Sequence, residues 1–189
     1  MRRSCVVALL CVAMAAGLAA KMKVRTQHDK SFDFSAVKTY AWHPDGAGEV
    51  KLLESSGDDA EQVRVRLEPS IRAAVERELS RVGLRQVPQA EADLLVYYYL
   101  LLGPKASMQT AGQFVQPIPG WGLPPFGGAT TSLDLAEQGS LIVDLSSPKL
   151  RSAVWRGTAQ TEVDREKADG PKRISAGVTE MFKQFPPKK

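Results

Sequence analysis

Apolar and polar positions alternate along several stretches of the chain, and each such stretch predicts a strand. The alternation is weak over residues 23–28 and clearer over residues 37–42, where Tyr40 and Trp42 are apolar anchors. Residues 93–102 are almost entirely apolar and are bounded by proline and glycine, which is typical of a central strand covered on both faces. We therefore expect two short strands and one buried strand in the first part of the domain.

Residues 140–146 and 152–163 form the clearest strand pair. Leu141 and Val143 share one face of the first strand, and Trp155 lies on one face of the second. Directly opposed residues of an antiparallel pair point the same way, so burying these three side chains together pairs odd-numbered positions with odd-numbered ones. This pairing predicts a connection of three or five residues around a proline.

The opposite face of this hairpin is half polar. A surface ion pair between Asp144 and Arg156 is expected there, worth at most about 1 kcal/mol. The residues of this face are Ser140, Ile142, Asp144, Val154, Arg156 and Thr158.

Apolar residues recur at three- and four-residue spacing after Pro69, which predicts a helix. Proline at the first helical position costs no hydrogen bond, and Gly83 can close the helix in a left-handed conformation. Val63 and Leu67 would extend the apolar stripe upstream, but Pro69 argues against one continuous helix.

A second helix is predicted to open at Gly170-Pro171 and to stop before Pro186-Pro187. Strands and helices in this mixture predict an α+β domain, with a mainly antiparallel sheet and two helices packed on one face. The core is expected to contain Tyr40, Trp42, Leu141, Val143, Trp155 and Phe182.

Two segments lack periodicity. Residues 44–59 are rich in Gly, Asp, Ser and Glu and are expected to be an exposed linker. Residues 103–131 hold six glycines and five prolines and are expected to be a long loop, a kind of segment that is usually functional or disordered. Its aromatic side chains would either contact a partner or fold back over the sheet, and they are Phe114, Trp121 and Phe126.

The first twenty residues have the layout of a secretory signal. Arg2 and Arg3 precede an apolar run that ends in small residues, and the run is shorter than the roughly 20 residues that a membrane-spanning helix needs. We expect cleavage after Ala19 or Ala20, which leaves a single domain over residues 21–187 and no transmembrane segment. An uncleaved anchor is the alternative.

Cysteine usage and charge then exclude several classes of site. Cys5 and Cys11 both lie in the expected signal, so the remaining chain has no thiol for a disulfide, a nucleophile or a metal site. The 25 Lys and Arg, less Arg2 and Arg3, leave 23 basic side chains against 21 acidic ones, so the net charge falls from +4 to +2. A charge this small, without a basic face, argues against nucleic-acid binding.

Neither histidine points to catalysis. His28 and His43 lie away from any Gly-x-Ser-x-Gly motif and lack the spacing of metal ligands, so both are expected to be surface or half-buried residues. No metal site and no cofactor is predicted.

Pairs of carboxylates are the remaining candidates for a catalytic site. Asp144 with Glu162, or Asp93 with Asp134, would serve acid/base catalysis if they met in a cleft, but nothing sets them apart from other acidic residues. Asp93 is instead expected to accept bonds from backbone amides at a strand start, and Asp144 to pair with a neighbour. No catalytic residue is predicted.

Four ordered segments resemble the family known as domain of unknown function 4136 (DUF4136). The resemblance implies a bacterial envelope protein of α+β fold without a settled activity, and it supplies no catalytic residues. The segments are Phe34 to Trp42, Ala92 to Val96, Gly139 to Leu145 with Val154 to Gly157, and Phe185 to Pro187.

Many members of that family look like lipoproteins, whose signal ends in a small-residue box followed by an acylated cysteine. Here Lys21 follows Leu18-Ala19-Ala20, and a lysine cannot take the thioether-linked lipid. Soluble periplasmic location is therefore favoured, and a membrane-anchored lipoprotein is the alternative.

Two classes of function remain open. The favoured one is a non-catalytic envelope module that binds an envelope protein or a small ligand through the 103–131 loop and the half-polar sheet face. The other is an enzyme whose site is assembled from scattered carboxylates and tyrosines. The oligomeric state is open at this point.

Overall fold

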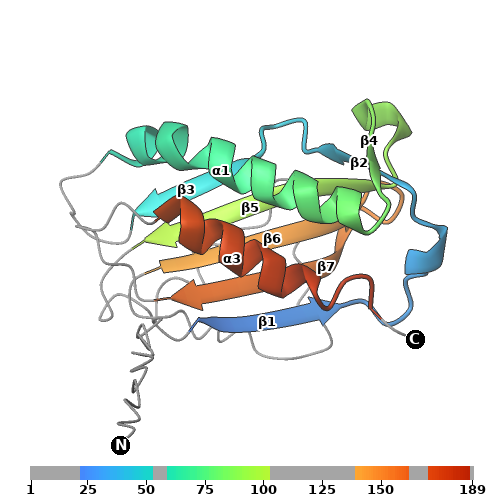
Figure 1. The fold of residues 1–189 in the computed structure, drawn as a ribbon. Coiled ribbons are helices and arrows are strands. Elements are labelled where there is room, and N and C mark those ends of the chain that lie inside the picture. The colour runs from blue at the N-terminus through green and yellow to red at the C-terminus, as the bar shows by residue number, and fades with distance from the viewer. Residues whose placement is uncertain (1–21, 53–58, 103–138, 162–169, 188–189) are drawn as a thin grey trace, which may run out of the picture.

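The computed structural model describes residues 22–52, 59–102, 139–161 and 170–187. Within these residues, seven strands form one sheet in the order β1-β7-β6-β5-β2-β4, with β3 also beside β5. Two helices, α1 and α3, lie side by side on one face of the sheet (Figure 1). The strands and α-helices are β1 (Lys23–His28), β2 (Thr39–Trp42), β3 (Gly48–Leu52), α1 (Ala60–Arg81), β4 (Arg85–Gln86), β5 (Leu94–Leu102), β6 (Gly139–Ser147), β7 (Ser152–Thr161) and α3 (Gly170–Phe182), and two short 3-10 helices are Phe34–Ala36 and Gln89–Glu91.

The α+β class is confirmed, but the prediction of a mainly antiparallel sheet was wrong because the sheet is mixed. Strand β6 pairs antiparallel with β5 and with β7, and β7 pairs antiparallel with β1. Strands β2 and β3 both run parallel to β5, and β4 runs parallel to β2. Parallel neighbours need a long crossover, and α1 supplies it between β3 and β5.

The expected linker over residues 44–59 contains strand β3. Gly48–Leu52 pairs with Tyr98–Leu102, and Val50 is buried. Gly48 lies against the ring of Tyr98, which leaves no space for a Cβ. A glycine that the sequence analysis took for a loop residue therefore permits close packing of a strand.

Helix α1 was expected to start at Pro69, but it begins at Ala60, nine residues earlier. Asp59 caps it by accepting a hydrogen bond from the amide of Glu61 at 2.8 Å. Pro69 lies on the exposed side of the helix, and burial of Val63 offsets the hydrogen bond that proline cannot make. Gly83 follows the helix with a φ of +87°, as predicted for its closing residue.

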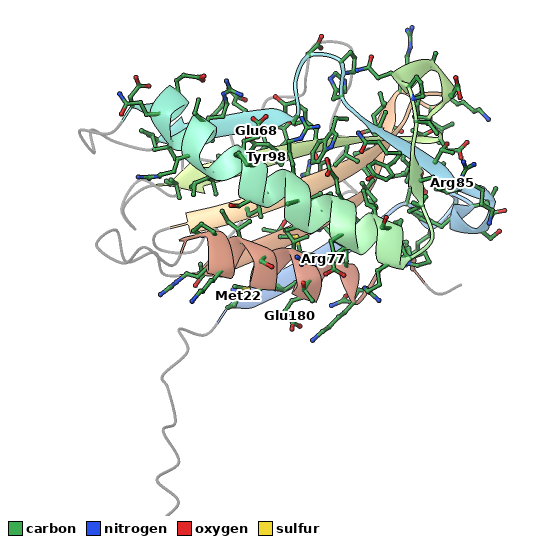
Figure 2. The ribbon with its side chains drawn as sticks, turned by 45° about the horizontal axis from the view of Figure 1, so that its top comes forward. Met22, Glu68, Arg77, Arg85, Tyr98 and Glu180 are labelled. Atoms are coloured by element: carbon green, nitrogen blue, oxygen red, sulfur yellow. The ribbon has the colours of Figure 1, made fainter. Side chains whose placement is uncertain are left out.

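The buried side chain of Tyr98 on β5 links the first half of α1 to the sheet through a hydrogen bond. The hydroxyl of Tyr98 donates to a carboxylate oxygen of Glu68 at 2.9 Å, and Arg64 donates to the same oxygen at 2.9 Å. Figure 2 shows Tyr98 and Glu68 next to each other at this part of α1. The bonds hold the segment before Pro69 in place.

The hairpin of β6 and β7 has the expected parity. Leu145 lies opposite Trp155 and Val143 opposite Gly157, so odd positions oppose odd positions. The connection, however, has four residues rather than three or five, because a register shift at Leu145/Ser146 restores the parity.

The core lies between the sheet and the two helices. Trp155 packs on Phe182, the last residue of α3, and on Phe185 just after it, with ring centroids 5.0 and 5.4 Å away. The six residues expected in the core are all buried members of this cluster: Tyr40, Trp42, Leu141, Val143, Trp155 and Phe182.

No helix within the described ranges is both long enough and apolar enough to cross a membrane.

Gly157 tests how tightly this core is packed. A Cβ at Gly157 would lie 2.5 Å from Cη2 of Trp155 and 2.9 Å from Sδ of Met181. We expect Gly157→Ala to lower the free energy of unfolding by about 2 kcal/mol in urea titrations, because the core must shift to admit a methyl group. The matched control is Gly170→Ala, whose Cβ would meet, among the described residues, Leu67 at the ordinary contact distance of 3.7 Å and should leave stability within about 0.5 kcal/mol. Equal effects of the two substitutions would contradict this packing.

Candidate functional site

The candidate site is the sheet face that points away from α1 and α3, called here the far face. Side chains alternate along a strand, so the neighbours of the core residues Val143 and Leu145 point to the far face. The strand register aligns them in rows across β5, β6, β7 and β1. One row is Tyr97, Asp144, Arg156 and Gln27, and the next is Tyr99, Ile142, Thr158 and Arg25.

An ion pair lies at the centre of the far face. Nε of Arg156 donates to Oδ1 of Asp144 at 2.7 Å, and one of its terminal nitrogens donates to Oδ2 at 2.9 Å. The two side chains are only 7% and 3% exposed. The expected pairing is therefore present, but the expectation of a surface pair was wrong. Burial disfavours the charge on Arg156, yet the pKa of Arg156 lies above its ordinary value because Asp144 outweighs that effect.

Aromatic side chains adjoin the ion pair. The rings of Tyr97 and Tyr99 are 5.0 Å apart, and His43 meets Tyr97 edge-on at 5.7 Å. Burial raises the pKa of both tyrosines, and the carboxylate of Asp144 raises the pKa of Tyr99 further. Both phenols are therefore held in the neutral form.

His43 is more buried than the sequence analysis expected, with 4% of its surface exposed. Burial lowers its pKa, against the opposing effect of Asp45. The amide of Asp45 donates to Nδ1 at 3.3 Å, which fits a neutral ring. His28, by contrast, is half-buried, as expected.

Exposure changes sharply toward the edge of the far face. Arg156, Thr158 and Gln160 on β7 are buried. Their row neighbours on β1 are exposed, and these are Gln27, Arg25 and Lys23. The described part of the far face thus meets solvent along β1.

Two other carboxylates are held by dense hydrogen bonding. Asp93 accepts from the amides of Lys38 and Thr39 at 2.9 and 3.1 Å, which confirms the expectation that it bonds backbone amides. These bonds lower the pKa of Asp93, the bond from Lys38 most of all. Glu78 is buried between α1 and α3, and although burial opposes its charge, bonds from Arg81 and Thr179 lower its pKa.

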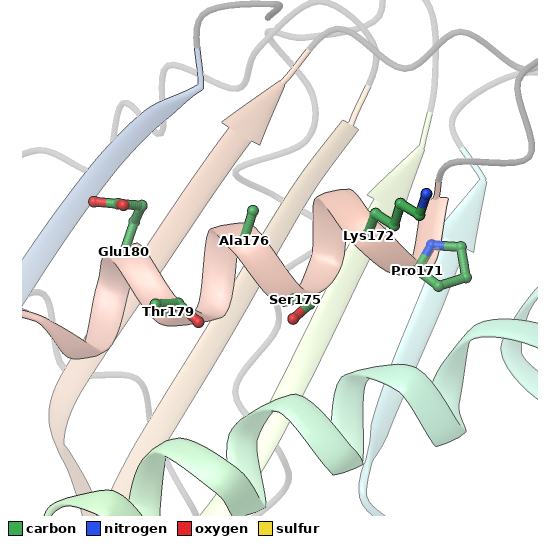
Figure 3. Close-up of a pocket in the computed structure, with 6 residues that line it drawn as sticks. All are labelled: Pro171, Lys172, Ser175, Ala176, Thr179 and Glu180. Atoms are coloured by element: carbon green, nitrogen blue, oxygen red, sulfur yellow. The ribbon is translucent and has the colours of Figure 1, made fainter.

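A shallow groove follows the outer side of α3 (Figure 3). Arg77 crosses from α1 to donate to Thr179 at 3.0 Å and to Ser175 at 3.3 Å, and Figure 2 shows it between the helices. These bonds tie the two helices together. The lining residues are Pro171, Lys172, Ser175, Ala176, Thr179 and Glu180, all from one helix, which favours a structural role for this surface.

The expected partner-contact residues Phe114, Trp121 and Phe126 lie outside the described residues, as do Glu162 and Asp134. The proposed carboxylate pairs therefore stay untested. Within the described ranges, no group of three or more His, Cys, Asp or Glu side chains is placed to hold a metal ion.

The position of the two tyrosines beside the ion pair was not predicted from the sequence. The signal was available, because Tyr97 and Tyr99 occupy alternate positions of one strand and so share a face. Their register with Asp144 could not be derived, since the long segment between β5 and β6 leaves the alignment of these strands open.

The ion pair yields a prediction about stability. Asp144→Asn should cost about 3–5 kcal/mol of unfolding free energy, because it leaves the buried Arg156 without a counter-charge. The double variant Asp144→Leu with Arg156→Met should be markedly more stable than Asp144→Asn in urea titrations. If the losses of unfolding free energy from Asp144→Leu alone and Arg156→Met alone add up to the loss in the double variant, the two charges act independently and the prediction is contradicted.

Asp93 yields a prediction about pH. Its pKa in the folded protein lies below the ordinary value of 3.8, so its charge stabilises the fold above that value and the contribution is lost as the pH falls through the folded pKa. We expect Asp93→Asn to lower the unfolding free energy by about 1 kcal/mol at pH 7. The difference should shrink as the pH falls below about 5 and be lost once the pH lies below the folded pKa of Asp93, as followed by urea midpoints. A difference that stays constant over this range would exclude the charge as its cause.

One solved structure supports this fold, and two others are similar over most of this chain. A DUF4136 family protein from Bacteroides thetaiotaomicron is similar over 87% of this chain and 96% of its own, with 18% identity and a TM-score of 0.54. The PelC dodecamer from Paraburkholderia phytofirmans matches over 89% of this chain and 100% of its own, with 9% identity and a TM-score of 0.43. A PDZ domain protein from Parabacteroides distasonis matches over 89% of this chain and 37% of its own, with 18% identity and a TM-score of 0.49.

No curated protein matches the sequence. The sequence pattern of the domain of unknown function DUF4136, by contrast, matches residues 24–187. That range includes almost every described element, and the chain belongs to the DUF4136 family.

Proposed function

We propose that the protein is an exported, non-catalytic binding module of the bacterial envelope. The observation that carries this proposal is the bonding of Arg156 to Asp144, which leaves the central charges of the far face engaged with each other. Tyr97 and Tyr99 beside them are held neutral. Buried groups that are engaged with each other in this way are poorly placed to transfer protons to a substrate, which favours a non-catalytic role.

An enzyme built from the same residues is less well supported. A general acid or base works best when its pKa lies near the working pH. Here the pKa shifts lead away from neutral pH, since the pKa values of Tyr97 and Tyr99 are raised and those of Asp93 and Glu78 are lowered. His43 becomes a weaker base through its burial.

The expected contact loop begins and ends at the same end of the sheet. Leu102 and Gly139, which flank residues 103–138, lie opposite each other in the β5–β6 register. A long segment closed by paired strands can vary in sequence without altering the sheet, which is a common arrangement for binding loops.

The loop aromatics provide the test of binding. Crosslinking of the purified protein into its own envelope extract should capture a partner that is lost, by at least about tenfold, when Phe114, Trp121 and Phe126 are all replaced by Ser. The thermal midpoint should stay nearly unchanged. The matched control is Val65→Ser with Leu150→Ser, because these residues are 63% and 56% exposed outside the loop and should retain capture.

A large fall in the midpoint of the triple variant would show that the loop belongs to the core and would overturn its role as a contact surface. Export is tested on the same material by intact mass. A chain that begins at Ala20 or Lys21 without an attached group supports the proposal, and a retained leader or an added lipid contradicts soluble export.

A further inference from the structure

The outer edge of β1 is the basis of an inference that does not depend on the proposed function. Strand β1 is the last in the sheet order, and no described strand pairs with its outer edge. Its ladder with β7 runs from Lys23 to His28 without a register shift, and it contains neither proline nor glycine. Such a straight edge is a template for another strand.

The direction of each backbone group on β1 follows from one hydrogen bond. The amide of Asp29 donates to the carbonyl of Val154 at 2.8 Å, so Asp29 belongs to a hydrogen-bonded pair with β7. These pairs alternate along an antiparallel ladder, so every second residue before Asp29 also bonds to β7. The backbone groups of Val24, Thr26 and His28 therefore point to the outer edge.

Charge decides which strand fits this edge. Lys23 and Arg25 are exposed on its far-face side, and charged side chains on an edge strand normally deter pairing. An antiparallel second copy centred on Arg25 would place Arg25 against itself. A second copy centred on Thr26 instead places Asp29 opposite Lys23 and Gln27 opposite Arg25, which relieves the repulsion.

The same register also gives hydrogen-bond partners to the outward backbone groups of β1. Thr26 faces Thr26 of the second copy, and Val24 faces His28, so all three residues with outward amides and carbonyls meet partners of the same kind. The two-fold axis is perpendicular to the sheet and leaves the helices of both copies on one face. Helix α3 packs on β7, so the two α3 helices would lie about 14 Å apart, three strand spacings, which exceeds the packing distance of helices.

We propose that β1 pairs antiparallel with β1 of a second copy of this chain, centred on Thr26, to form a dimer with one continuous sheet. The interface is a single strand edge, so the dimer is reversible and depends on concentration.

Thr26→Pro tests the backbone contribution. It removes an outward amide that β7 does not use, so the fold should keep its thermal midpoint while the dissociation constant rises at least about tenfold in sedimentation equilibrium. Thr26→Val is the matched control, because it loses the same hydroxyl but keeps the amide, and it should dimerise like the unaltered protein. A protein that stays monomeric at all concentrations, or a Thr26→Pro variant that dimerises normally, overturns the proposal.

A charge exchange tests the register even if Thr26→Pro fails to fold. Lys23→Glu should weaken the dimer about fivefold, and adding Asp29→Lys to it should restore most of the loss. Absence of restoration would contradict the pairing of Lys23 with Asp29.

A disulfide provides an independent measurement of the two-fold axis. Thr26→Cys, made with Cys5→Ser and Cys11→Ser, should oxidise to a covalent dimer, since hydrogen-bonded partners lie about 5.5 Å apart at Cα. Val24→Cys in the same background should not, because Val24 faces His28 of the second copy. Oxidation at Val24 but not at Thr26 would show that another register, or another interface, joins the copies.

Discussion

The burial of both faces of strand β5 is the constraint on which the rest of the structure depends. Its nine residues carry no charge, and seven of them are buried. A strand buried in this way needs neighbours on both edges and cover on its faces. Strand β6 provides one edge, while β2 and β3 together provide the other, one following the other along β5. Helix α1 then serves both needs, since it connects β3 to β5 and covers the face that carries Tyr98.

The Asp144–Arg156 pair and Trp155 fix the register of the central hairpin from opposite faces. Side chains alternate along a strand, so a slip of one residue would move Trp155 to the far face and Arg156 into the apolar core. Burying an ion pair costs desolvation free energy that its Coulomb attraction barely offsets. The pair therefore contributes little net stability over an apolar pair, and its effect lies in excluding the wrong register.

The sequence was sufficient where a pattern is local. The apolar run of β5 and the odd-with-odd parity of the β6–β7 pair follow from the local pattern of apolar positions, and the start of the second helix at Gly170 follows from the Gly170-Pro171 pair. Strand β3 was missed because Gly48 and its polar flanks have the composition of a loop, and its burial depends on Tyr98, fifty residues away. The parallel strands could have been predicted, since a strand, a long helix and a strand in succession indicate a parallel crossover. The burial of the far face could not have been predicted, because a strand with alternating polar residues has the same sequence pattern whether its polar face is exposed or buried.

The rows of the far face show why function is better sought at the margin of the sheet than at its centre. From Tyr97 through Asp144 to Arg156, each side chain contacts its neighbours within the same row or the next, and little is left for an external group. At Gln27, one strand further, the row reaches solvent. A charged side chain that is buried in an ion pair is not available to bind a ligand, whereas an exposed charged side chain is. The interior of this face therefore sets the shape and charge of the domain, and among the described residues those on β1, at its edge, are exposed enough to meet another molecule.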